Sequence, residues 1–153
     1  MAGITETDGN PFTYDKMNRQ NPPKTLCISD LDGTLLNKNA ELSEYTAAAL
    51  NNLIGKGLHF SVATARTAAT AVKMLERVNI NIPIILMNGV LIYDIAEKRY
   101  LKKEILSKEK TAQILAAMKK ANQSGLMYAL SGEELLTYYD RIYSKALHDF
   151  VDE

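Results

Sequence analysis

The sequence predicts an α/β fold that is built on a parallel β-sheet and continues into a smaller α+β segment. Three short apolar runs, at residues 26–28, 58–63 and 84–87, are separated by two segments in which apolar side chains recur with helical spacing. Continuous apolar strands that alternate with amphipathic helices are typical of a parallel sheet covered on both faces. After residue 90 this alternation ends, which indicates a second unit of different architecture.

The first apolar run predicts a buried strand. Residues 26–28 are Leu-Cys-Ile, so we expect Cys27 to lie in the core. A helix is then predicted from Ser43, whose hydroxyl is a favoured N-cap, and Gly55 and Gly57 are its stop signal. This strand and helix open the first unit of the chain.

Two more strands and a second helix complete the first unit. The second apolar run ends at Thr64, and the third ends at Asn88-Gly89. Between them a second helix is predicted, and its apolar stripe comprises Val72, Leu75 and Val78. The order is therefore strand–helix–strand–helix–strand.

The second unit is predicted to mix short strands with two helices. A helix capped by Ser107 presents apolar side chains at Ile114, Leu115, Met118 and Ala121. A last amphipathic helix is predicted over residues 142–150. The strand candidates are residues 90–93, 99–103, 126–130 and 135–139.

These patterns divide the chain into three predicted parts. Residues 1–23 contain Gly3, Gly9 and the pair Pro22-Pro23 but no periodic apolar pattern, so we expect a loosely ordered leader. Residues 24–90 form the first unit, and residues 91–153 form the second.

Composition limits the class of protein. The 153 residues carry 18 Lys+Arg and 18 Asp+Glu, so the net charge is zero and bulk electrostatics gives no support for nucleic-acid binding. No apolar run approaches the roughly 20 residues of a membrane helix, and the first 24 residues lack the apolar segment of a secretory signal. The single Cys excludes an intrachain disulfide. We therefore expect a cytoplasmic protein without nucleic-acid or membrane partners.

The chemistry is predicted to lie where the three strands end. Ligands of open α/β sheets bind outside the carboxyl ends of the strands, and these ends carry Asp30, Thr64 and Asn88. Asp32 and Gly33 follow Asp30 closely, and a glycine lets a ligand approach the backbone. Two carboxylates beside hydroxyl and backbone N–H groups suit a Mg²⁺ ion and a phosphate, because Mg²⁺ takes carboxylate and phosphate oxygens.

Three segments carry a family resemblance. Residues 29–36, Ser-Asp-Leu-Asp-Gly-Thr-Leu-Leu, resemble the first motif, DxDGT, of the haloacid dehalogenase-like (HAD) superfamily. Residues 62–66 resemble its second motif, a strand that ends in Thr or Ser, and residues 87–94 resemble a segment of the Cof-type phosphatases. The resemblance implies a Rossmann-like parallel core sheet, with residues 91–153 as part of an α+β cap inserted into it.

The resemblance also implies a reaction and its residues. Asp30 is the expected nucleophile toward a phosphomonoester, and Asp32 is the expected general acid and base. Mg²⁺ is expected on the Asp30 carboxylate and the Asp32 backbone oxygen. The substrate implied is a small phosphorylated metabolite such as a sugar phosphate. The expected phosphate-binding residues are Gly33, Thr64, Arg66 and Asn88.

The sequence also departs from the family pattern. Ala65 replaces the usual glycine of the second motif, and neither the third-motif Lys context nor a GDxxxD-like fourth motif occurs. We therefore interpret the chain as an N-terminal portion of a Cof-type phosphatase. The alternative is a catalytically incomplete fragment that is inactive or only binds phosphate. An unfinished sheet is expected to leave an open edge through which the chain self-associates.

Simpler interpretations of the same residues remain open. Thr64 could cap the following helix, Asn88-Gly89 could be only a turn, and Arg66 could be a solvated residue at a helix start. A calcium-binding loop beginning at Asp30 is disfavoured because its sixth position is Leu35, where that loop needs Gly. A signalling receiver phosphorylated on Asp30 is a further alternative. It is weaker, because no strand end carries a receiver-like Lys.

Overall fold

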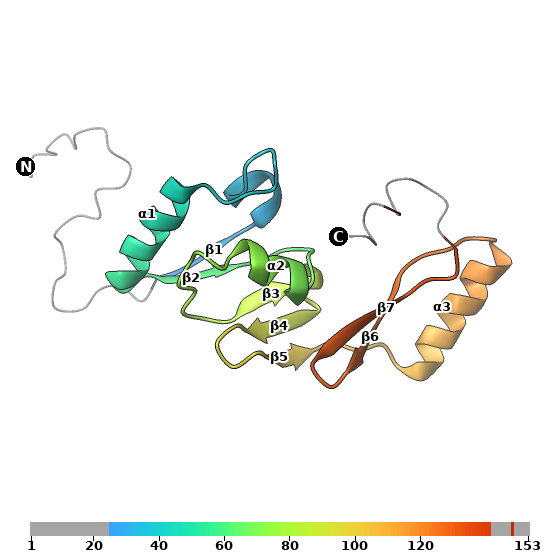
Figure 1. The fold of residues 1–153 in the computed structure, drawn as a ribbon. Helices are drawn as coiled ribbons and strands as arrows, with labels where there is room; N and C mark the ends of the chain where they lie inside the picture. The colour runs from blue at the N-terminus through green and yellow to red at the C-terminus, as the bar shows by residue number, and fades with distance from the viewer. Residues whose placement is uncertain (1–24, 142–147, 149–153) are drawn as a thin grey trace, which may run out of the picture.

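The computed structural model describes residues 25–141 and residue 148, and it has the predicted α/β architecture (Figure 1). The predicted leader, residues 1–23, and most of the predicted last helix, residues 142–150, lie outside the described residues. The elements in chain order are β1 (Leu26–Ser29), α1 (Glu44–Gly55), β2 (His59–Val62), α2 (Ala68–Met74), β3 (Ile84–Leu86), β4 (Leu91–Asp94), β5 (Arg99–Lys103), α3 (Lys108–Lys120), β6 (Met127–Ser131) and β7 (Glu134–Tyr138).

The first three strands run parallel, as the alternation predicts. β1 pairs with β2 in parallel, with Leu26 opposite His59. β2 and β3 meet through a parallel bridge between Ala63 and Ile85, and the backbone N–H of Thr64 donates to the carbonyl of Ile85 at 3.0 Å. Hydrogen bonds therefore link the strands at the carboxyl end of β2, where the predicted site lies.

The sheet continues past the predicted boundary at residue 90. β3 pairs antiparallel with β4, and β4 pairs antiparallel with β5, with Leu86 opposite Leu91 and Asp94 opposite Arg99. The division of the chain at residue 90 stays a prediction, and hydrogen bonding attaches the next two strands to the first unit.

The helix signals locate α1 well and α2 less well. The Ser43 hydroxyl accepts the N–H of Thr46 at 3.1 Å, and Gly57 follows α1 with φ +98°, a conformation that favours glycine. α2 ends at Met74, so Val78 does not extend its apolar stripe. Val78 is nevertheless buried, in a turn in which its N–H donates to the carbonyl of Leu75.

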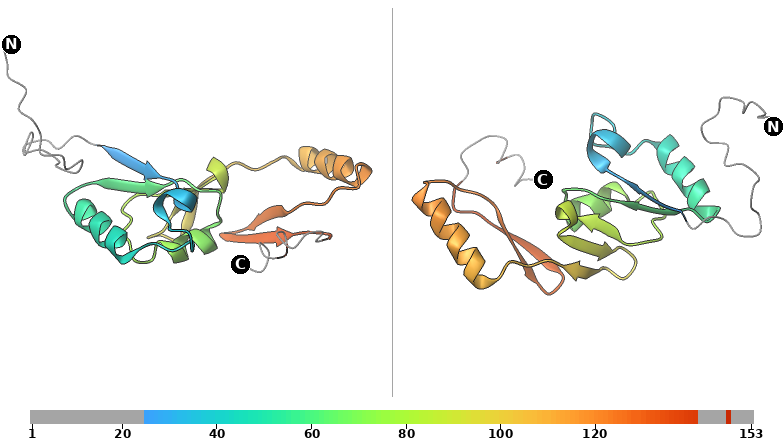
Figure 2. Two further views of the ribbon diagram at one scale, coloured as in Figure 1. Left: turned by 90° about the horizontal axis from the view of Figure 1, so that it is seen from above. Right: turned by 180° about the vertical axis from the view of Figure 1, so that it is seen from behind.

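One face of the parallel strands is covered, whereas the sequence pattern predicts two. α1 and α2 lie on the same side of β1–β3 (Figure 2). Consecutive right-handed crossovers that advance in one direction place their helices on one face, so the order β1-β2-β3 explains this arrangement. The opposite face carries an apolar groove of about 490 Å³, lined by Leu26, Ile28, His59, Ser61, Ile82, Pro83, Ile85 and Ile92.

The prediction that β1 is a buried strand is wrong. Leu26 is 54% exposed and Ile28 is 48% exposed, and Cys27 is exposed rather than part of the core. Among the described strands β1 pairs only with β2, so it is an edge strand without a neighbour on its other side. The open sheet edge that the sequence predicts is present in this part of the chain.

The second unit is loosely packed. α3 begins after Ser107, whose hydroxyl accepts the N–H of Lys110 as predicted, but no α3 residue is buried. Its expected apolar side is largely open, because Ile114 is 45% and Leu115 is 46% exposed. β6 and β7 form an antiparallel hairpin beside β5 (Figure 1). Within the described residues, no helix is long and apolar enough to cross a membrane.

Candidate functional site

The loop after β1 is anchored by the residue between its two aspartates. Leu31 is fully buried in the hydrophobic core, while Asp30 and Asp32 on either side of it are exposed. The N–H of Leu31 donates to the Asp30 carboxylate at 2.7 Å, and the N–H of Leu36 donates to the carbonyl of Leu31 at 2.9 Å. Burial of Leu31 thus fixes the loop and leaves both carboxylates at the surface.

Gly33 occupies a conformation that its residue type allows. Its φ is +72°, in the left-handed region, and a Cβ placed there would meet no atom within 4 Å. The glycine is therefore required by the backbone turn and not by crowding, and the residue is exposed.

The three strand ends are joined by backbone hydrogen bonds. The N–H of Ala63 donates to the carbonyl of Ser29 at 2.9 Å, and the N–H of Asn88 donates to the carbonyl of Thr64 at 3.1 Å. Asn88 has φ +56°, which is uncommon for a residue other than glycine and belongs to a short 3-10 turn. The structure therefore brings the loops of all three predicted site residues, Asp30, Thr64 and Asn88, to one edge of the sheet.

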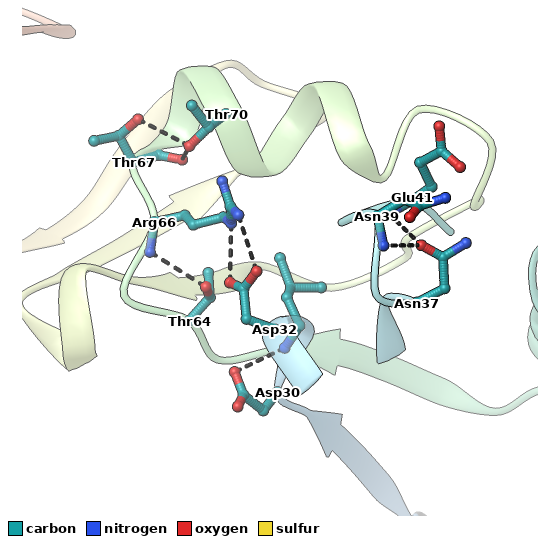
Figure 3. Close-up of polar contacts among 10 residues, drawn as sticks. Asp30, Asp32, Asn37, Asn39, Glu41, Thr64, Arg66, Thr67 and Thr70 are labelled. Atoms are coloured by element: carbon teal, nitrogen blue, oxygen red, sulfur yellow. Dashed lines mark hydrogen bonds and ion pairs between the residues drawn. The ribbon is translucent and has the colours of Figure 1, made fainter. Parts of the chain in front are cut away.

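Arg66 binds Asp32 through a two-point contact (Figure 3). Its Nε and Nη2 atoms each lie 2.9 Å from a different oxygen of the Asp32 carboxylate. The backbone N–H of Arg66 also donates to the Thr64 hydroxyl at 3.2 Å, so the second strand end positions this arginine. The hydrogen bond from Arg66 lowers the pKa of Asp32, although partial burial opposes the shift.

A groove of about 880 Å³ begins beside Arg66. It runs between α2 on one side and strands β4–β7 on the other, and three tyrosines, Tyr93, Tyr100 and Tyr128, line it. Burial raises the pKa of each of these tyrosines, so at neutral pH their hydroxyls are uncharged groups that can donate or accept hydrogen bonds.

No pattern in the sequence predicts this groove. The tyrosines that lie close together in the sequence, Tyr138 and Tyr139, are about half exposed and do not line the groove. The lining tyrosines sit on separate strands, β4, β5 and β6, and only the strand pairing brings them together. No local pattern could have indicated them.

The residues at the end of β1 fit Mg²⁺ in their chemistry. The Asp30 carboxylate and a backbone carbonyl are hard oxygen donors, and Mg²⁺ commonly takes one or two carboxylates together with phosphate oxygens and water. The Asp32 carboxylate is engaged by Arg66, so its backbone oxygen is the donor that this residue offers. Among residues 25–141 and 148, no three His, Cys, Asp or Glu side chains gather as a metal cluster.

Comparison with known proteins identifies the family. A family model described as haloacid dehalogenase-like hydrolase matches residues 27–152. The chain belongs to this family. Curated relatives include proteins whose names contain the word phosphatase. One from Buchnera aphidicola subsp. Baizongia pistaciae is 38% identical over 73 residues, and one from Mycoplasma pneumoniae is 30% identical over 101 residues.

These matches span about a quarter to a third of the relatives. The Buchnera match covers 48% of this chain and 27% of that protein, and the Mycoplasma match covers 66% and 36%. Among solved structures, a haloacid dehalogenase-like hydrolase from B. subtilis has a TM-score of 0.64 at 26% identity, over 82% of this chain and 42% of that one. The Thermotoga maritima protein TM0651 shares the fold with a TM-score of 0.63 at 20% identity, over 83% of this chain and 45% of that one. The HAD-like fold predicted from the motifs is thus confirmed.

Proposed function

We propose that this chain carries the nucleophile half of a Mg²⁺-dependent phosphomonoester hydrolase that acts on a small phosphorylated metabolite. The observation that carries the proposal is the exposed Asp30 carboxylate at the end of β1, next to the hydrogen-bonded loops of Thr64 and Asn88. Membership of a hydrolase family and phosphatase-named relatives support the same reaction class. A cytoplasmic location, expected from the sequence, is part of the proposal.

Asp30 would act first. An Asp30 oxygen would attack phosphorus while the bond from phosphorus to the ester oxygen breaks, which leaves an aspartyl-phosphate. Asp32 would give a proton to the departing oxygen, and would then take a proton from the water that attacks the same phosphorus. Phosphate then leaves and Asp30 is restored. Splitting one displacement into two steps is the advantage of covalent catalysis. Mg²⁺, when bound, would supply positive charge between the carboxylate and the phosphate.

The contact between Arg66 and Asp32 favours the second of these steps. A lowered pKa keeps Asp32 as a carboxylate, which suits the removal of a proton from water. Donating a proton to the ester oxygen requires a protonated Asp32, which cannot accept both bonds from Arg66. The proposal therefore needs Arg66 to separate from Asp32 when substrate binds, and a phosphate oxygen is a natural new partner for the guanidinium.

The remaining predicted residues would hold the phosphate. The Thr64 hydroxyl, the amide of Asn88 and the exposed backbone at Gly33 would surround the phosphate oxygens. The non-phosphate part of the substrate would extend into the groove that starts at Arg66, where tyrosine hydroxyls suit a hydroxylated metabolite.

The test is turnover of p-nitrophenyl phosphate with and without Mg²⁺, in wild type and in Asp30→Asn. We expect Mg²⁺-dependent release of p-nitrophenol that Asp30→Asn abolishes. A matched control is Asp140→Asn, because Asp140 bonds to Ser124 and lies outside the candidate site. Turnover that survives Asp30→Asn would remove Asp30 from the mechanism.

The second candidate function is phosphate binding without turnover. It is favoured by the observation that the chain spans 42% of the B. subtilis hydrolase, so residues outside the matched part of such proteins can belong to their sites. Vanadate binding that requires Asp30 and Thr64, in a chain that releases no p-nitrophenol, would select this candidate. Self-association through the open edge of β1 is tested in parallel by light scattering, where a concentration-independent monomer would exclude it.

A further inference from the structure

The tip of the hairpin β6–β7 is held against β5 through contacts of Glu133 and Gly132 with Tyr100 and Lys103. One carboxylate oxygen of Glu133 accepts the backbone N–H of Tyr100 at 2.6 Å, and the other lies 2.8 Å from Nζ of Lys103. Lys103 Nζ also donates to the carbonyl of Gly132 at 3.1 Å and lies 5.4 Å from the centroid of the Tyr100 ring. Glu133 therefore joins two residues of β5 to the turn of the hairpin.

The Glu133 carboxylate accepts a backbone N–H of β5, that of Tyr100, which faces away from the paired strand β4. Tyr100 pairs with Tyr93 of β4 on one side, and on the other side β5 has no strand partner among the described residues. The Glu133 carboxylate takes the place of a strand there. Hydrogen bonds that involve a charged partner are about twice as strong as neutral ones, so the contact is well suited to anchoring.

The docked hairpin forms one wall of the groove beside Arg66. Tyr128, Glu133 and Leu135 contribute that wall, and Thr67 and Thr70, at the start of α2, lie on the other. Between β5 and α3 the connection is exposed, with Ile105 67% and Leu106 58% accessible, so it does not hold the hairpin by packing. Only Leu130 and Leu135 of the hairpin pack against the core.

We propose that Glu133 is a positioning residue that docks the hairpin β6–β7 onto β5 and thereby forms the groove for the non-phosphate part of the substrate. The role of the groove in substrate binding rests on the proposed function, whereas the docking of the hairpin by Glu133 does not. Glu133 acts through the hairpin and contacts none of the reacting groups, so its removal should affect binding of large substrates and spare the chemical step.

The matched pair of variants is Glu133→Ala and Glu134→Ala. Both remove one negative charge from the groove lining, but of the two residues it is Glu133 that contacts β5. A third variant, Glu133→Gln, keeps an acceptor for the Tyr100 N–H and loses the charge pair with Lys103, so it should fall between the two.

The first readout needs no activity. Hydrogen exchange at the Tyr100 amide should be at least 10-fold faster in Glu133→Ala than in wild type, and unchanged in Glu134→Ala. Spin labels at Ala69→Cys and Thr137→Cys, in a Cys27→Ser background, should show a wider distance distribution only in Glu133→Ala. Unchanged exchange and distances in Glu133→Ala would overturn the docking role, whether or not the chain is an enzyme.

The second readout is the split between KM and kcat. With a sugar phosphate that is a substrate, KM should rise about 5–20-fold in Glu133→Ala while kcat changes less than 2-fold, and Glu133→Gln should recover part of the loss. Acetyl phosphate, which is too small to fill the groove, should show no change in KM. If wild type turns over nothing, the proposed function fails and the exchange result still decides the docking role. A drop in kcat with unchanged KM would contradict the role of the groove in substrate binding.

Discussion

The strands β1–β5 and the segment that follows them are stabilised in different ways. Within the part of the chain that the structure describes, the buried residues of the hydrophobic core run from Leu31 to Tyr100, and no residue of α3 is buried. The later segment is held together by the ladder of β6 and β7 and attached through Leu130, Leu135 and the Glu133 contact. Packing therefore fixes the candidate active-site loops, whereas a few local contacts fix the wall that faces them.

This difference predicts where a mutation is costly. Core burial contributes about 25 cal/mol per Å² of apolar area, while contacts at the surface contribute far less. Substitutions of one type should therefore have unequal effects in the two regions. The difference between the two free-energy changes measures how independently the two regions are stabilised.

The largest contrast should come from truncating one leucine in each region. Leu86 of β3 is fully buried, so Leu86→Ala should lower the free energy of unfolding by about 3 kcal/mol, from lost burial and the cavity left behind. Leu115 of α3 is 46% exposed, so Leu115→Ala should cost less than about 1 kcal/mol. Urea unfolding followed by circular dichroism measures both.

Equal costs for the two leucines would break the comparison. Equal costs would mean that α3 packs against another surface in solution, such as a second copy of the chain. Repeating the Leu115→Ala measurement over a range of protein concentrations separates these cases, because only association makes the cost depend on concentration.

The sequence predicts the strands β1–β3 and their helices better than it predicts which neighbours each strand has. The order and direction of the strands 26–29, 59–62 and 84–86 and the cap at Ser43 follow from local patterns, and the structure confirms them. The exposure of Cys27 does not, because an apolar run reveals a strand but not which neighbours the strand has. Coverage of one sheet face also follows only from the strand order, through the handedness of the crossovers.

In the candidate site, too, some features can be predicted from the sequence and others cannot. The positions of Asp30, Thr64 and Asn88 at strand ends are predictable because each follows an apolar run. The contact of Arg66 with Asp32 joins residues 34 apart in sequence, and that of Glu133 with Tyr100 joins residues 33 apart. Such contacts depend on the tertiary arrangement, and a single sequence carries no spacing rule for them. The catalytic roles assigned by resemblance stay predictions.

A smaller contrast should come from the two helix caps. The hydroxyls of Ser43 and Ser107 each accept a backbone N–H, at 3.1 and 3.2 Å, from the residue three positions on. Ser43→Ala should lower the free energy of global unfolding by about 1 kcal/mol, because α1 folds with the core. Ser107→Ala should leave that value nearly unchanged and instead speed hydrogen exchange in α3, which can unfold locally. Equal effects on global unfolding would show that the two regions unfold as one.

The smallest contrast concerns pH. Each region contains a carboxylate whose pKa a neighbouring cation lowers, Asp32 beside Arg66 and Glu133 beside Lys103. A depressed pKa stabilises the folded state at pH above the ordinary carboxyl pKa of about 4, and this stabilisation is lost as pH falls through the depressed value. Arg66→Met should therefore destabilise the protein at pH 7 and have progressively less effect at lower pH. Because the Asp32 side chain is 51% exposed, the difference should stay below about 1 kcal/mol and shrink in salt.

The matched substitution for the Glu133 pair is Lys103→Met, which should alter the pH dependence of Tyr100 amide exchange and leave global unfolding almost unchanged. A cycle with Asp32→Asn isolates the first pair, because Arg66→Met should then add no further pH dependence between pH 3 and 7. If Arg66→Met still changes that dependence in the Asp32→Asn background, another acid shares the guanidinium. The reaction step in which Arg66 leaves Asp32 for a phosphate would then need a different starting contact.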